Sequence, residues 1–171
     1  KFTISNPDFE DKFRYQWLPA YKAVIEPDRR AGIGDSLVHT VALRRLLAHE
    51  RSHSQVPDDL DIRLKEYASP VKELFCELNC LIDYWDVQNS RVAGITGREW
   101  EVALGLQLSE GILEYKAFHT DGSRKSYYFS SSAIKTHLER AGSLSEINTR
   151  LTWNSNREAL AMIKQLHPQV K

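Results

Sequence analysis

Apolar side chains recur at helical spacing through most of this chain. The clearest stretch is residues 70–86, where the apolar positions follow the 3.6-residue period of an amphipathic helix. Those positions are Val71, Leu74, Phe75, Leu78, Leu81, Ile82 and Trp85. The same periodicity, together with capping residues, predicts further helices over about 8–25, 36–53, 62–67, 96–109, 130–140 and 155–166. The chain is therefore expected to be mostly helical.

The period changes after residue 111. Residues 112–118 and 126–130 have the β-branched and aromatic composition of strands, and Thr120-Asp121-Gly122-Ser123 between them is typical of a turn. A β-hairpin at about 112–129 is predicted, followed by a serine-capped helix. The expected fold class is α+β, predominantly helical, with this hairpin in the C-terminal part.

Composition and charge narrow the class of protein. The 171 residues are 42% hydrophobic and 27% charged, which suits a globular protein with a buried core. No apolar run approaches the roughly 20 residues that span a bilayer, and the polar first residues do not form a signal peptide. Cys76 and Cys80 lie four residues apart on one predicted helix, as buried thiols in a reducing compartment would. A cytoplasmic protein without membrane contact is expected.

The net charge is zero, but it is distributed unevenly. Residues 1–115 carry 14 Lys or Arg and 19 Asp or Glu, whereas residues 116–171 carry 9 and 4. The first part is thus at −5 and the second at +5. A basic C-terminal part can offer a surface for phosphates even on a neutral protein.

The order of predicted elements in this basic part resembles half of a known DNA-binding domain. A helix at 96–109 leads into Glu110-Gly111-Ile112, then a strand, a basic turn and a second strand. The positions that carry the resemblance are Leu108, Gly111, Ile112, Gly122, Arg124, Lys125 and Tyr127. Residues 96–140 are in this way similar to the second half of the winged-helix domain of bacterial repressors.

The resemblance implies a non-enzymatic protein that binds double-stranded DNA, such as a transcriptional regulator or a mobile-element accessory factor. A recognition helix would enter the major groove and a wing would reach flanking phosphates. The residues expected at the DNA are Thr96, Arg98, Gln107, Arg124 and Lys125. The expected division of the chain is a helical part at 1–69, for dimerisation or partner docking, and a winged-helix-like part at 70–171. No cofactor is expected.

A second hypothesis comes from His49-Glu50-Arg51-Ser52-His53, which matches the His-Glu-x-x-His pattern of zinc peptidases. On a helix the two imidazoles lie one turn apart, and Glu73 or Glu77 of the next long helix could supply a third ligand. A zinc-dependent hydrolase is therefore an alternative. Arg51 inside the motif is a cation beside a dication, and the residues after the motif are polar, so we expect no zinc at His49 and His53.

A third hypothesis is a protein-interaction module. Phe9, Phe13, Trp17 and Tyr21 recur at four-residue spacing in the first predicted helix. This aromatic face could bind a protein partner, or a second copy of the chain, through residues 1–69.

Overall fold

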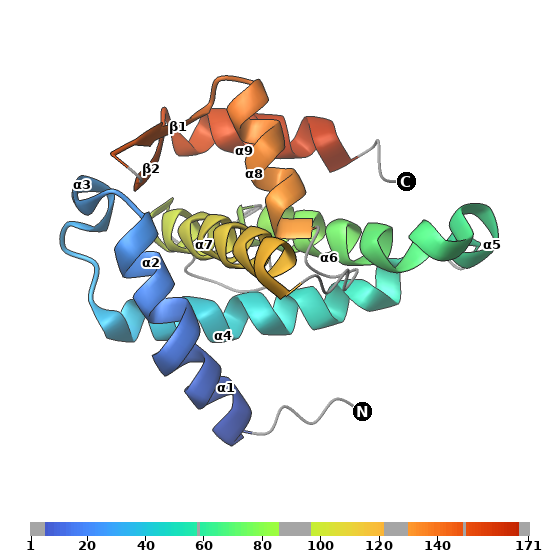
Figure 1. Cartoon of the computed structure of the whole chain (residues 1–171), viewed down its shortest axis with the longest axis horizontal. Helices are drawn as coiled ribbons and strands as arrows, with labels where there is room; N and C mark the ends of the chain where they lie inside the picture. The colour runs from blue at the N-terminus through green and yellow to red at the C-terminus, as the bar shows by residue number, and fades with distance from the viewer. Residues whose placement is uncertain (1–5, 58, 86–96, 122–129, 149, 168–171) are drawn as a thin grey trace.

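Three long helices form the centre of the protein, as the computed structural model shows (Figure 1). The structure describes residues 6–57, 59–85, 97–121, 130–148 and 150–167. The central helices are α4 (Asp35–Ser52), α6 (Ala68–Trp85) and α7 (Gly97–Asp121), and α4 packs against both of the others. The helices α8 (Ser130–Arg140) and α9 (Asn156–Leu166) cover one side of α6.

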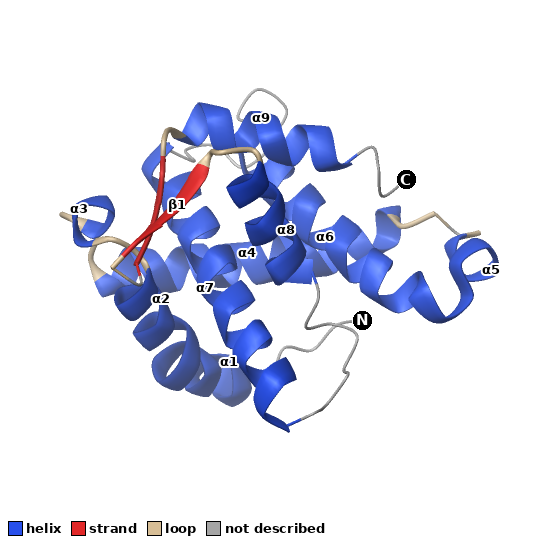
Figure 2. Cartoon of the chain, turned by 45° about the horizontal axis from the view of Figure 1, so that its top comes forward, coloured by secondary structure: helices blue, strands red, loops and turns tan. Residues whose placement is uncertain are grey.

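Shorter elements complete the described structure. In chain order before α6 these are α1 (Asn6–Lys12), a π-helical turn η1 (Phe13–Trp17), α2 (Leu18–Val24), α3 (Pro27–Arg30), the 3-10 turn η2 (His53–Gln55), α5 (Leu60–Leu64) and the 3-10 turn η3 (Lys65–Tyr67). A two-stranded antiparallel sheet, β1 (Leu144–Ile147) and β2 (Arg150–Trp153), lies between α8 and α9 in the chain (Figure 2). The predominantly helical α+β class predicted from the sequence is confirmed.

The helices form where periodicity and capping predicted them. In α6, the buried side chains Leu74, Leu78 and Leu81 lie on the apolar stripe that the sequence indicated. At the start of α9, the Ser155 hydroxyl accepts a hydrogen bond from the Glu158 backbone N–H at 3.1 Å, which satisfies one of the free donors of the first turn.

One hydrophobic core joins all of the long helices. It contains Val41 of α4, Leu78 of α6, Trp100 of α7, Ile134 of α8 and Ile163 of α9. The expected boundary between residues 69 and 70 lies inside α6, and residues on both sides of it enter this core. Within the described ranges, no helix combines the length and the hydropathy that a membrane span needs.

The predicted hairpin at 112–129 is wrong in its first strand. Helix α7 continues through residue 112 as far as Asp121, and residues 122–129 lie outside the described part of the chain. Gly111 is a packing position and not a turn: a Cβ there would lie 2.9 Å from the carbonyl oxygen of Ser131 in α8. The observed hairpin comes later, and Asn148, in its turn, has a φ of 51°.

The aromatic N-terminal face, named as a possible partner-binding surface, is largely packed inside the protein. Phe9, Phe13 and Tyr21 are buried, and the Phe9 ring stacks on Phe13 and meets Trp17 edge-on. The π-helical turn of η1 ends two residues before Pro19, whose missing N–H and bulky ring do not fit a regular helix interior. These aromatic side chains therefore form part of the hydrophobic core or pack against it.

Candidate metal centre

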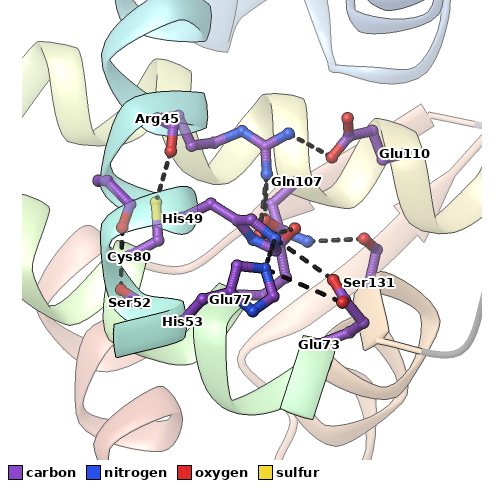
Figure 3. Close-up of polar contacts among 11 residues, drawn as sticks. Arg45, His49, Ser52, His53, Glu73, Glu77, Cys80, Gln107, Glu110 and Ser131 are labelled. Atoms are coloured by element: carbon purple, nitrogen blue, oxygen red, sulfur yellow. Dashed lines mark hydrogen bonds and ion pairs between the residues drawn. The ribbon is translucent and has the colours of Figure 1, made fainter. Parts of the chain in front are cut away.

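Two histidines face each other at the end of α4. His49 lies in its last turn and His53 follows directly at the start of η2, so their four-residue spacing places both rings on one side of the helix. Their Nε2 atoms are 3.2 Å apart, and the rings meet edge to face (Figure 3). Both nitrogens thus point toward one region of space.

Glu73 brings a carboxylate to the same region from α6. Its Oε2 lies 3.3 Å from Nε2 of His49, and its Oε1 lies 3.9 Å from Nε2 of His53. The packing of α6 along α4 produces this approach, because Glu73 is in the second turn of α6, opposite the last turn of α4. Three donor groups from two helices therefore converge.

Two of the three distances between these atoms fit a divalent ion, and the third, 3.9 Å between His53 Nε2 and Glu73 Oε1, is longer. Two nitrogens that are each about 2.0–2.1 Å from one tetrahedral zinc ion lie about 3.3 Å apart. The Nε2–Nε2 distance of 3.2 Å and the His49–Glu73 distance of 3.3 Å are close to that value. Glu50 lies beside this donor set: one of its carboxylate oxygens and a nitrogen of each of the two histidines all lie within 4.8 Å of one another.

Glu77 contacts His49 from the other side of the ring. Its Oε1 is 3.1 Å from His49 Nδ1, although the two are not aligned as a hydrogen bond. Burial lowers the pKa of His49, but the neighbouring carboxylates of Glu73 and Glu77 outweigh it and raise the pKa to about 10. In the absence of metal, His49 is therefore an imidazolium held between two carboxylates.

A buried polar network lies behind Glu77. Arg45, one turn before His49 in α4, donates to Glu77 at 3.0 Å and to Gln107 at 2.5 Å, and it also bonds to Glu110. The Gln107 amide donates to the Ser131 hydroxyl at 2.6 Å. These contacts connect α4, α6, α7 and α8 (Figure 3).

Of the five predicted DNA-binding residues, the structure describes Arg98 and Gln107. Gln107 is 0% exposed, so it cannot reach a groove of DNA. Arg98 bonds to the carbonyl oxygen of Ala31, next to α3. Thr96, Arg124 and Lys125 lie outside the described residues. By contrast, the four residues named for the alternative, His49, His53, Glu73 and Glu77, meet in one cluster.

Arg45 and Glu110 are site residues that the sequence did not single out. Arg45 occupies a position of the apolar stripe of α4, after Val38, Val41 and Ala42 at helical spacing. A charge on such a stripe predicts a buried partner, because an unpaired buried charge is strongly unfavourable. That signal was present, but it did not say which acidic residues would be the partners.

One comparison with known proteins found a match, and it is a likeness of fold. A solved structure of DPP III from Caldithrix abyssi matches this fold with a TM-score of 0.72 and 18% sequence identity. The match covers 95% of this chain and 31% of that one, so the chain spans less than a third of the DPP III chain. No family model and no curated protein matches the sequence. The likeness to DPP III contradicts the expected nucleic-acid-binding function.

Proposed function

We propose that this protein is a metal-dependent hydrolase of the peptidase class, with zinc as the metal that best suits its donors. His49, His53 and Glu73 would hold the ion, and Glu50 would act as general base. The observation that carries the proposal is the convergence of three donor atoms, with His49 Nε2 at 3.2 Å from His53 Nε2 and 3.3 Å from Glu73 Oε2. Two nitrogens and one oxygen are a donor set that is common in catalytic zinc sites.

The likeness to DPP III adds support for the reaction class. DPP III is dipeptidyl peptidase III, and metal-assisted hydrolysis is the peptidase chemistry that the described residues favour. The objection from Arg51 also weakens, because Arg51 is on the exposed side of α4, whereas the His49 side chain is only 12% exposed. The first histidine of the motif is therefore largely shielded from solvent, and the Arg51 cation lies on the other side of the helix.

Metal binding and proton transfer would be carried out by different residues of the site. An ion bound at His49, His53 and Glu73 would act as a Lewis acid toward the scissile carbonyl. Glu50 accepts the proton that the attacking water loses as the new C–O bond forms. It then gives this proton to the amine nitrogen as the C–N bond breaks, so that the carboxylate is regenerated.

Metal analysis of the purified chain tests the proposal before any activity is measured. We expect about one zinc ion per chain after dialysis, lost in His53→Ala and Glu73→Ala and retained in Glu50→Gln. His39→Ala is the matched control, because His39 is also on α4 but pairs with Glu10. A wild-type chain without zinc after incubation in zinc would refute the proposal.

Hydrolysis is the second measurement, with dipeptide conjugates of a fluorogenic amine as substrates. We expect Glu50→Gln to lose hydrolysis while it keeps the metal, because the variant retains the ligands and lacks the base. His39→Ala should keep both. Equal hydrolysis by Glu50→Gln and by the wild type would exclude Glu50 as the base.

A cytoplasmic location and a protein partner at residues 1–69 stay part of the proposal. Two buried cysteine thiols, Cys76 and Cys80, fit a reducing compartment. In the described part of residues 1–69, the large apolar side chains that are exposed and that a partner could cover are Tyr15, Leu43, Leu47, Ile62 and Tyr67. Light scattering of the wild type and of Leu47→Glu would detect self-association through this surface.

A further inference from the structure

Arg45 is a buried cation next to the candidate metal centre. It is 6% exposed, and its guanidinium contacts three side chains from two helices, Glu77 of α6 and Gln107 and Glu110 of α7. Burying a guanidinium is costly unless its donors are paired, so these contacts hold it in one orientation. Gln107 is itself fixed by its bond to Ser131 of α8.

Glu77 is shared between Arg45 and His49. Its Oε2 accepts from Arg45 Nη1 at 3.0 Å, and its Oε1 faces His49 Nδ1 at 3.1 Å. Glu73 instead lies on the Nε2 side of the same ring, where His53 also points. The two nitrogens are on different edges of an imidazole, so Glu77 could reach the Nε2 side only by leaving Arg45.

The two carboxylates are one turn apart on α6 and face the same histidine, so their chemistry alone does not decide which of them is a ligand. The contact with Arg45 separates them. It holds Glu77 on the Nδ1 side of His49 and leaves the Nε2 side to Glu73. With two histidines and one carboxylate as ligands, a tetrahedral ion keeps one position for water or substrate.

We propose that Arg45 is a positioning residue that keeps Glu77 out of the coordination sphere and so keeps the fourth position of the metal open. This inference rests on the proposed function and adds to it the choice of the third ligand. Without Arg45, Glu77 keeps its neighbours Gln107 and His49 but loses its cationic partner, and it can then turn toward the ion as a fourth protein ligand. The site would then resemble a closed structural zinc site, which binds metal and leaves no position for catalysis.

Arg45→Met tests the proposal, because methionine fills part of the space and carries no charge. We expect zinc to bind at least about tenfold more tightly than in the wild type, measured by competition with a chromogenic chelator, because a cation beside the ion is lost and a carboxylate is gained. Hydrolysis should fall although the metal is retained. Arg45→Lys should bring both values back toward those of the wild type.

Glu110→Gln is the matched control. It removes the second carboxylate partner of Arg45 and leaves the contact between Arg45 and Glu77 in place. Zinc affinity in this variant should stay within about threefold of the wild type, since the ligands and Glu77 keep their positions. A folded Arg45→Met variant with unchanged or weaker zinc affinity would overturn the proposal.

A second pair of variants applies even where Arg45→Met does not fold. Glu73→Gln should lose the metal, whereas Glu77→Gln should keep about one zinc per chain, because only Glu73 is a ligand. Loss of zinc in Glu77→Gln to the same extent as in Glu73→Gln would overturn the role of Arg45 and leave the metal centre standing. A wild-type chain that binds no zinc would instead overturn the proposed function, and the role of Arg45 with it.

Discussion

At the scale of single residues, His49 couples the candidate site to the stability of the protein. It lies between Glu73 and Glu77, and its pKa of about 10 is well above the ordinary value of 6.5. A raised pKa means that the folded, metal-free protein holds its proton more tightly than the unfolded chain does. The resulting stabilisation is complete below about pH 6.5 and is lost as the pH rises through about 10.

We therefore expect the free energy of unfolding of the metal-free protein to decrease between pH 7 and pH 10. The decrease should approach about 1.4 kcal/mol per pH unit, the value for one proton. Urea titrations in the presence of a chelator measure it. His49→Gln removes the titrating group, so the difference between wild type and variant isolates this effect. A difference that does not change with pH would contradict it.

At Cys76 the neighbouring carboxylates disfavour the charged form of the side chain, whereas at His49 they favour it. Burial, together with the carboxylates of Glu73, Glu77 and Glu50, raises the pKa of its thiol to about 12. We expect Cys76 and Cys80 to react with a thiol reagent at pH 8 only when the protein unfolds, because the thiolate is the reactive form. Labelling in native buffer and in denaturant measures this. Rapid labelling of a folded sample would contradict the burial of both thiols.

At the scale of elements, the sequence predicted where buried stripes are, but not how far each helix continues. The ends of α4, α6 and α8 agree with the periodicity to within a residue or two. Helix α7 does not, because short apolar runs such as Ile112-Leu113 fit a strand as well as a helix. The contact of Gly111 with the α8 backbone resolves this ambiguity, and it involves residues 20 positions away in the chain.

The candidate metal centre, too, could be predicted only in part from the sequence. The spacing of His49 and His53 is local, and it fixes their common face on any helix. The choice of Glu73 over Glu77 depends on Arg45, whose orientation depends in turn on Gln107 and Glu110 of another helix. No local pattern contains that information.

The packing of α7 on α8 gives a prediction of its own. In Gly111→Ala the new methyl group would lie 2.9 Å from the backbone oxygen of Ser131, and a backbone cannot move aside as cheaply as a side chain. We expect a loss of about 1–3 kcal/mol of stability. Gly97→Ala is the control in the same helix, because nothing lies within 4 Å of a Cβ there. Denaturant unfolding should show a lower stability for Gly111→Ala than for Gly97→Ala. Equal stabilities of the two variants would show that the α8 backbone can move away from the new methyl group without loss of stability.

At the scale of the whole molecule, the hydrophobic core and the candidate metal centre are formed by the same helices. The core contains residues from α4, α6, α7, α8 and α9, and the Arg45 network connects four of these five helices. The candidate ligands come from α4 with η2 and from α6. An ion bound there would therefore link two central helices of the core.

This arrangement predicts that metal removal lowers the stability of the entire fold and not of one helix. A ligand that binds only the folded state stabilises it by about 2.7 kcal/mol when its free concentration is 100 times the dissociation constant. We expect a chelator to lower the midpoint of thermal unfolding, with a single transition that has the same midpoint by far-UV circular dichroism and by tryptophan fluorescence. The fluorescence reports the core directly, because Trp100 and Trp153 are buried in it.

The chelator effect should persist in Glu50→Gln, which keeps the ligands, and disappear in His53→Ala, which does not. Separate midpoints for the two signals would mean that α4 and α6 can part without unfolding the core, and the proposed link between site and fold would then be wrong.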